Sequence, residues 1–336
     1  MKLKFSVRSQ LVISILFALL LTTGSLWGQV KISEENWVLP TYPVNPADKN
    51  PMFFKGESYQ GASKVIYPYA LNDMIANEKT DKAWKVLILE NEYIKLGVTP
   101  EIGGKIYYGT DKTNNYNFLY KNNVVKPSNI GMTGAWVSGG IEWCVIHHHR
   151  ASTFLPVDYH LAENSDGSKT IWIGETEPRH QMRWTIGITM FPGKSYYQAE
   201  VKIHNPTPYT NTFLYWANVA AHTNRDYQVI FPPSVDTVAY HAKNSFAHWP
   251  VATEIYNGRD FRDGVDISWW KNSVEQNSYF AYEVKSFKQY WYPVKDIQGF
   301  KNANINGAVN LEKTGGNQVF LGYYSTRKVE KAKILL

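Results

Sequence analysis

The sequence predicts an all-β protein, a sandwich of large antiparallel sheets. Apolar and polar residues alternate along most of the chain, and turn-forming dipeptides separate the alternating segments. Almost no stretch shows the 3.6-residue period of an amphipathic helix. Aromatic residues, which are enriched in strands, make up 15% of the chain, with 12 Trp, 23 Tyr and 15 Phe. Together these features favour a packed β core over a helical or mixed fold.

The first strands are predicted on either side of Asn91. Alternating residues over 84–89 and 93–98 indicate two paired strands, and a third strand over 105–108 follows Gly103 and Gly104. Upstream, residues 29–55 are rich in proline and only weakly periodic. They are expected to form an extended lead-in that packs on the domain surface.

Three turns divide the middle of the chain. Asp166-Gly167 separates residues 157–163 from 169–175, which is typical of a β-hairpin. Pro192-Gly193 joins 184–191 to 196–204, and the Asn-Pro-Thr-Pro turn at 205–208 leads into a strand over 212–219. The pattern predicts a meander of neighbouring strands. With no internal repeat or linker between them, residues 56–283 are expected to form one domain.

The N-terminus reads as a signal peptide over residues 1–28. Lys2, Lys4 and Arg8 precede an apolar run over 11–21, which is too short for a typical membrane span. The run ends without a cysteine, so no lipid anchor is expected. We therefore predict a periplasmic or secreted protein that has no membrane association after cleavage. An uncleaved N-terminal anchor is the alternative.

Charge and cysteine content exclude several classes of function. The formal net charge is +6 without any long basic run, and removal of the signal peptide leaves 32 basic against 29 acidic residues. Neither value indicates a nucleic-acid partner. A single cysteine, Cys144, excludes an internal disulfide and a cysteine-rich metal site. The motifs of phosphate-binding loops, serine hydrolases and zinc proteases are absent.

Glu142 lies in the densest group of candidate functional residues. It follows the glycine pair at 139–140 and lies between Trp136 and Trp143 in the sequence. The two-residue period of a strand directs Glu142 to the face opposite Ile141 and Trp143. A carboxylate next to indole rings would lose water, which would raise its pKa as a general acid requires. The alternative is a bulged strand whose glutamate pairs with a buried arginine.

A run of three histidines and an arginine follows, from His147 to Arg150. On a strand, His147 and His149 would share a face and could relay a proton or contact a sugar hydroxyl. A metal site is not expected, because no second group of ligands has the usual spacing. The alternative is a solvated basic loop.

A second carboxylate would be needed for glycoside hydrolysis. Asp158, Glu175 and Glu177 are the candidates, and the two carboxyl groups would lie about 5–5.5 Å or about 6.5–9.5 Å apart. Arg179 and Arg183 fall on one face of a predicted strand entry. Their guanidinium groups suit the recognition of a carboxylate, either on a uronic acid or inside the fold.

Alternation over 215–222 places three candidate ligand-binding side chains on one face. Trp216 would provide an aromatic platform, Asn218 an amide and His222 an imidazole. Sugar rings stack on such platforms because their C–H faces are apolar. The alternative for Trp216 is burial in the core.

Two groups of segments carry a family resemblance. The first is 91–93 with 99–106, which resembles the opening of galactose-mutarotase-like proteins and implies a large β-supersandwich. The second comprises 134–143, 147–150, 156–158, 182–184, 216–218, His222 and 226–233. These segments resemble a bacterial family of unknown function that is often fused to tetratricopeptide repeats and is linked with glycan utilisation. The resemblance covers about residues 50–283.

The resemblance ends after Tyr282. Relatives continue with an acidic strand, whereas residues 289–293, 300–304 and 308–312 resemble a region beyond that strand. Residues 284–336 are therefore expected to form a shortened and truncated C-terminal β segment. In mutarotase-like enzymes a carboxylate on a late strand acts as a base, so the resemblance implies that this chain lacks that partner.

These observations lead to one functional prediction with two alternatives. We expect a carbohydrate-active protein, a glycoside hydrolase or an aldose-epimerase-like enzyme, that needs no metal and no cofactor. The predicted catalytic residues are Glu142, His147, His149 and His222. The predicted substrate-binding residues are Trp136, Trp143, His148, Arg150, Asp158, Arg183, Trp216 and Asn218. The alternatives are a non-catalytic glycan-binding remnant and a product that folds poorly.

Overall fold

The computed structural model describes residues 28–47, 66–130, 133–147, 149–240, 244–273, 280–281, 288–316 and 318–333. Apart from Gly28, the predicted signal peptide lies outside the described residues. The predicted lead-in at 29–55 is described only up to residue 47. Within the described ranges, no helix is long and apolar enough to span a membrane.

One antiparallel sheet, here called the first sheet, has the strand order β1-β2-β3-β4-β8-β13, and β5 pairs with β4. The strands are β1 (Lys31–Thr41), β2 (Thr80–Glu90), β3 (Ile94–Thr99), β4 (Lys105–Asp111), β5 (Tyr116–Asn117), β8 (Ile141–Cys144) and β13 (Trp216–Val219). The strands predicted on either side of Asn91 and after the Gly103-Gly104 pair are confirmed.

The stretch interpreted as a surface lead-in contains the edge strand of this sheet. β1 pairs with β2 along its whole length, from Lys31 opposite Glu90 to Thr41 opposite Thr80. Most of its side chains are exposed or half-buried, which explains the weak periodicity. Pro40 is compatible with an edge strand because only one side of such a strand is hydrogen-bonded.

The second sheet has the strand order β21-β12-β11-β10-β9. Its strands are β9 (Asp158–Glu163), β10 (Lys169–Glu177), β11 (Met182–Met190), β12 (Tyr197–His204) and β21 (Lys288–Trp291). The predicted hairpins at Asp166-Gly167 and Pro192-Gly193 are confirmed, and both glycines adopt positive φ. β13 does not continue this meander, because it pairs with β8 of the first sheet.

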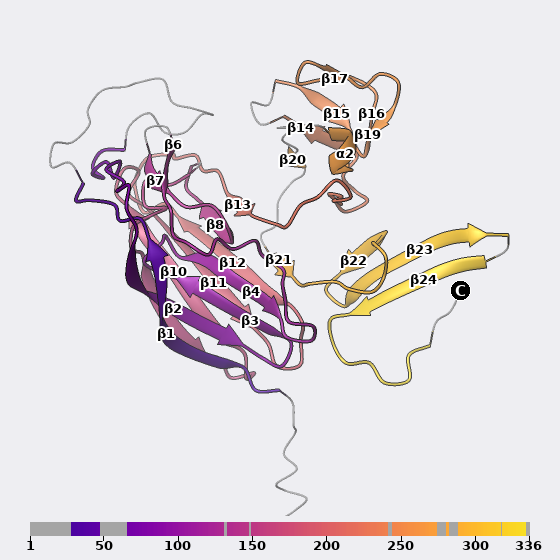
Figure 1. The fold of residues 1–336 in the computed structure, drawn as a ribbon, viewed down its shortest axis with the longest axis horizontal. Helices are drawn as coiled ribbons and strands as arrows, with labels where there is room; N and C mark the ends of the chain where they lie inside the picture. Colours follow the sequence, from indigo (N-terminus) through magenta and orange to yellow (C-terminus); the bar gives the residue numbers. More distant parts are fainter. Residues whose placement is uncertain are drawn as a thin grey trace, which may run out of the picture.

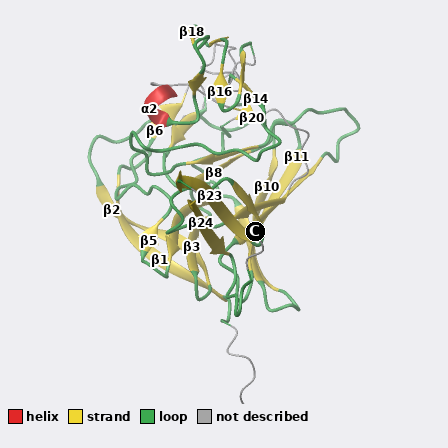
Figure 2. Ribbon diagram, turned by 90° about the vertical axis from the view of Figure 1, so that its right-hand side faces the viewer, coloured by secondary structure: helices red, strands yellow, loops and turns green. Residues whose placement is uncertain are grey.

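The two sheets pack face to face around one apolar core (Figure 1). Alternate residues of the central strands fill that core, among them Leu87, Leu96, Trp143, Trp184 and Ile186. The predicted all-β sandwich is therefore confirmed, and Figure 2 shows strands and loops with a single short helix, α2 (Trp270–Ser273), among the described residues.

Smaller β elements lie beside the sandwich (Figure 1). One group surrounds a separate apolar cluster that includes Trp249 and Tyr256. Its strands are β14 (Thr237–Ala239), β15 (Phe246–His248), β16 (Val251–Ala252), β17 (Ile255–Tyr256), β18 (Arg259–Asp260), β19 (Val265–Asp266) and β20 (Phe280–Ala281). A three-stranded sheet is formed by β22 (Asn302–Asn304), β23 (Gly307–Gly315) and β24 (Gln318–Ser325), and a ribbon by β6 (Ser128–Ile130) and β7 (Gly134–Trp136).

Gly140 sets the entry into β8, the strand that carries Glu142. Its φ is +63°, and a Cβ atom there would lie 2.0 Å from the carbonyl oxygen of Ile106 on β4. Its amide donates to Tyr120 and its carbonyl accepts from Ala220, both at 2.8 Å. A larger residue would separate β8 from β4, so Gly140 is the residue that lets these two backbones approach closely.

We expect Gly140→Ala to lower the free energy of unfolding by about 2–4 kcal/mol, because it adds a backbone clash to an unfavourable φ. The matched control is Gly258→Ala, which has φ +76° but no atom within 4 Å of the added Cβ. It should cost only about 1 kcal/mol. Urea denaturation measures both variants, and equal losses would contradict the clash.

Candidate functional site

The site is built on the face of β8 that points away from the core. Ile141 and Trp143 are fully buried in the core between the sheets, whereas Glu142 faces Trp136 and Asn218 on the other side. The predicted alternation of β8 is confirmed. The separate prediction that Trp143 binds substrate was wrong: a core position leaves no indole surface for a sugar, so Trp143 is not part of a binding platform.

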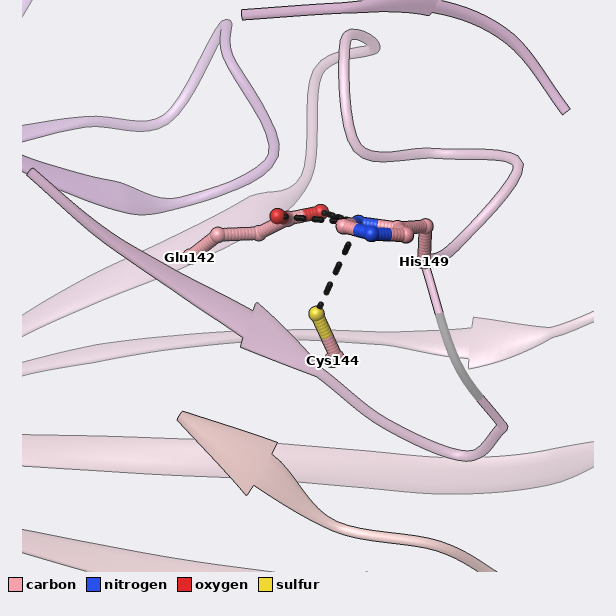
Figure 3. Close-up of side chains that lie close together, drawn as sticks. All are labelled: Glu142, Cys144 and His149. Atoms are coloured by element: carbon pink, nitrogen blue, oxygen red, sulfur yellow. Dashed lines mark hydrogen bonds and ion pairs between the residues drawn. The ribbon is translucent and has the colours of Figure 1, made fainter. Parts of the chain in front are cut away.

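Glu142 is 3% exposed and accepts hydrogen bonds from four side chains. Nε1 of Trp136 and Nδ2 of Asn218 donate to Oε2 at 2.8 and 3.1 Å. The hydroxyl of Thr153 donates to Oε1 at 2.6 Å. Nδ1 of His149 lies 3.1 Å from both carboxylate oxygens (Figure 3). Both oxygens are therefore engaged by the protein itself.

Lys105 is a member of this site that the sequence did not reveal. It opens β4, is 2% exposed, and donates from Nζ to the backbone carbonyl of Val137. Burial lowers the pKa of Lys105 to about 8, although the charge of Glu142 acts in the opposite direction. A lysine beside two glycines was the only available signal, since the register that brings β4 next to β8 is not readable from the sequence.

The electrostatics of Glu142 are the reverse of those predicted. Burial alone would raise its pKa, but the hydrogen bond and charge of His149, together with Lys105 and Thr153, hold the pKa of Glu142 well below 4.5. The indole of Trp136 also approaches through its N–H and not only through its ring. Glu142 is therefore a stable carboxylate and not a general acid.

The side chain of His149 is partly exposed. Its ring packs edge-on against Trp136 and Trp216, with centroids 5.7 and 5.1 Å away. Its side chain is 15% exposed. An ionised carboxylate only accepts hydrogen bonds, so Nδ1 carries a proton in this contact and Nε2 is the ring nitrogen that remains for another partner. No described residue hydrogen-bonds to Nε2, so the Glu142–His149 dyad can exchange a proton through that atom.

Cys144 completes a set of three metal-ligand types with Glu142 and His149. Their ligand atoms all lie within 4.8 Å of one another, and the thiol is 3.9 Å from Nδ1 of His149 (Figure 3). Burial raises the pKa of the Cys144 thiol, and Lys105 adds a positive charge nearby. Because a metal requires a thiolate and free carboxylate lone pairs, these contacts favour a hydrogen-bonded dyad over a metal centre.

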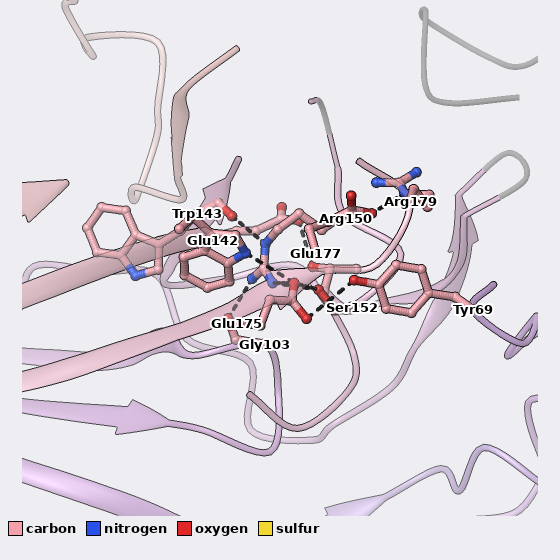
Figure 4. A network of polar contacts seen from close by, with 11 residues as sticks. Tyr69, Gly103, Glu142, Trp143, Arg150, Ser152, Glu175, Glu177 and Arg179 are labelled. Carbon is pink, nitrogen blue, oxygen red and sulfur yellow. Dashed lines mark hydrogen bonds and ion pairs between the residues drawn. The ribbon is translucent and has the colours of Figure 1, made fainter. Parts of the chain in front are cut away.

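Arg150 was predicted to bind substrate, but it is 1% exposed and belongs to the interior (Figure 4). Its Nε donates to the carbonyl of Trp143, and Nη2 donates to that of Gly103. Nη1 donates to Ser152 and pairs with Glu175 at 3.3 Å. The alternative interpretation of Glu142 was a glutamate that pairs with a buried arginine. Such a pair exists, but its glutamate is Glu175 and not Glu142.

The histidine run forms a loop and not a strand, because β8 ends at Cys144. His147 and His149 therefore do not share a strand face. The ring of His147 packs against His180 with centroids 5.0 Å apart, while the ring of His149 packs against tryptophans. His148 lies outside the described residues.

Three other predicted residues are not brought to Glu142. Asp158 is exposed at the start of β9, and Arg183 is exposed on β11 between the buried Met182 and Trp184, so it faces away from the core. His222 is exposed beyond the end of β13 and contacts Tyr116 and Tyr120, with centroids 6.0 and 5.6 Å away. Period-2 reasoning failed for His222 because the strand ends at Val219.

Two surface cavities of about 300 and 280 Å³ lie away from the dyad. The first is lined by Trp84, Phe154 and Lys82 among others, and the second by residues of β1 and β2. Neither of these two cavities is lined by Glu142 or His149.

Residues 62–294 match the family described as "Domain of unknown function (DUF5107)". The chain belongs to the DUF5107 family. This match confirms the predicted resemblance to a family of unknown function. The DUF5107 chain is also similar to the crystal structure of a TPR-domain containing protein from Parabacteroides distasonis ATCC 8503, at 21% identity and a TM-score of 0.57. The alignment covers 84% of this chain and 42% of that one, and at this identity it supports the fold alone.

In the DUF5107 chain, we expect Arg150→Met to lower the free energy of unfolding by about 3–5 kcal/mol, because Glu175 would be left without its cation. The double variant Arg150→Met/Glu175→Leu should recover part of that loss. Arg262→Met, which breaks an exposed pair with Asp260, should leave the urea midpoint nearly unchanged. Similar losses of unfolding free energy for Arg150→Met and Arg262→Met would show that the buried Arg150–Glu175 pair stabilises the fold no more than an exposed pair.

Glu142→Gln tests the ionised state of the dyad. The folded state lowers the pKa of Glu142, so the carboxylate stabilises the fold above pH 4.5, and that contribution is lost as the pH falls further. The difference in unfolding free energy between wild type and Glu142→Gln should be largest at about pH 7 and shrink on acidification. A difference that grows towards low pH would contradict the assignment, and exposed Glu330→Gln serves as the control.

Proposed function

We propose that this protein binds a glycan at the His149 ring and that the Glu142–His149 dyad takes the proton of the anomeric hydroxyl while water supplies one to the ring oxygen. The bond between the anomeric carbon and the ring oxygen then breaks, and the reverse transfer closes the ring in the other anomer, as in aldose epimerases. The observation that carries the proposal is the dyad itself. A buried, ionised carboxylate lies 3.1 Å from Nδ1 of the imidazole, and no described residue hydrogen-bonds to its second nitrogen. This arrangement suits an imidazole that acts as a general acid and base.

The surroundings of His149 support a sugar as the ligand. Trp136 and Trp216 flank the imidazole and are both partly exposed, so they offer apolar surfaces next to a polar group. Sugars present the same combination of C–H faces and hydroxyl groups. The predicted membership of the galactose-mutarotase-like fold, and export to the periplasm or beyond, remain part of this proposal.

Interconversion of anomers by proton transfer at the anomeric hydroxyl and the ring oxygen fits better than glycoside hydrolysis. A hydrolase needs one carboxyl group that stays protonated and a second that is free to act. Here the pKa of Glu142 is lowered, because His149, Lys105 and Thr153 outweigh the effect of burial. Glu175 accepts hydrogen bonds from Ser152, Trp184 and Arg150. Both carboxylates are occupied within the fold, which leaves the imidazole as the group that can exchange protons.

A non-catalytic glycan-binding module is the second candidate. The observation in its favour is the fixed environment of His149, whose ring is held between two indoles while Nδ1 is bound to Glu142. In that case the dyad would only present an imidazole to a sugar hydroxyl.

A glycan array followed by saturation-transfer NMR tests both candidates. For a bound reducing sugar, we expect exchange between its α and β anomer signals, and His149→Gln should slow that exchange by about 100-fold or more. Trp216→Ala should weaken binding. His204→Gln, on an exposed position of β12, is the control and should change neither.

Each outcome decides between the candidates. Binding without anomer exchange in the wild-type protein would support the binding module. Wild-type exchange that survives His149→Gln would remove the dyad from the mechanism. Failure to bind any glycan would overturn the proposal.

A further inference from the structure

A second glutamate–histidine pair lies in the turn between β10 and β11. Oε2 of Glu177 accepts the backbone N–H of His180 at 2.8 Å and lies 3.0 Å from Nδ1 of the same residue. Oε1 accepts Nε of Arg179. The Glu177 side chain is 1% exposed and that of His180 is 33% exposed. The pair therefore repeats the arrangement of Glu142 and His149, with a buried carboxylate behind a more exposed imidazole.

The charge state of this pair also resembles that of the first. Burial alone would raise the pKa of Glu177, but the charge and hydrogen bond of Arg179, with the contacts of His180, lower it. The ionised carboxylate keeps a proton on Nδ1 of His180, so Nε2 is the atom that remains for a ligand. No described residue hydrogen-bonds to that Nε2.

The two pairs border the same segment, residues 145–147 and 149–153. The ring of His147 contacts the ring of His180. His149 follows His147 by two residues, so the Cα atoms of His147 and His149 are at most about 7.6 Å apart. Ser152 and Thr153 donate to Glu175 and Glu142, respectively. Figure 4 shows Arg150 between Trp143 on one side and Arg179 on the other. The loop that carries His147 and His149 therefore lies next to the turn that carries His180.

The pairs are near each other but not in contact. His149 packs on Trp136 and Trp216, His180 packs on His147, and no ring contact joins His149 to His180. Near His180, the guanidinium of Arg179 lies 5.7 Å from the ring centroid of Tyr69. The second pair thus has its own polar and aromatic surroundings.

We propose that the Glu177–His180 pair forms a second glycan subsite, so that the ligand of this protein is an oligosaccharide extending from His149 to His180. The inference rests on the proposed glycan binding at His149. In this arrangement, one sugar unit lies at the His149 ring with its two indoles, and a neighbouring unit hydrogen-bonds to Nε2 of His180. Affinity should then depend on chain length.

Calorimetry with two homologous series tests the inference: glucose to cellotetraose, and galactose to β-1,4-galactotetraose. For the series that binds, we expect wild-type affinity to rise about tenfold or more from the monosaccharide to the longer members, as for one added polar contact. His180→Gln should remove that gain and leave monosaccharide affinity unchanged. His149→Gln should weaken binding at every length.

Two further variants separate the loss of a contact from a disturbed fold. His180→Phe keeps a ring against His147 but lacks the nitrogen, so it should also lose the gain with length. His204→Gln should keep the gain in affinity with chain length. Circular dichroism verifies that all variants are folded.

The possible failures are distinct. Equal wild-type affinity for all lengths, or a gain with length that survives both His180 variants, would overturn the second subsite while glycan binding at His149 stands. If no member of either series binds to the wild-type protein, the proposed function and the second subsite fail together.

Discussion

The burial of Arg150 is the constraint on which this end of the structure depends. A guanidinium inside a protein is costly unless it is paired and its donors are satisfied. Arg150 meets both conditions by binding two backbone carbonyls, a hydroxyl and Glu175, and it lies 4.4 Å from the centroid of the Trp184 ring. These partners come from both sheets. The segment after β8 must therefore follow one path, and that path places Ser152 and Thr153 against two different carboxylates.

A cation lies near each of the three glutamates around this arginine. The pairs are Glu142 with Lys105, Glu175 with Arg150, and Glu177 with Arg179. Such matching limits the electrostatic cost of burial and, for Glu142 and Glu177, lowers the carboxylate pKa. Because the carboxylates bind groups of the protein itself, the histidines are the side chains left to contact a ligand. Ligands would meet His149 and His180, which the carboxylates orient, and not the carboxylates themselves.

The predictions that the structure confirmed were based on local pattern, although not every prediction of that kind was correct. The alternation of Ile141, Glu142 and Trp143 and the hairpin at Asp166-Gly167 depend only on neighbouring residues, and both were correct. The pKa of Glu142 was predicted in the wrong direction because its sign depends on Lys105 and His149. The prediction that β13 continues the meander of the second sheet was wrong for a related reason. Several strands could pair with β13, and the sequence does not show which of them does.

The sequence by itself determined the all-β class, the main hairpins and the position of Glu142 on the outer face of β8, because strand alternation and turn chemistry act over a few residues. Only the tertiary structure decided which groups surround that carboxylate. Lys105 comes from β4, Asn218 from β13, and Thr153 from the segment that Arg150 holds. These contacts join positions far apart in the chain, and the direction of a pKa shift follows from such neighbours and not from residue type.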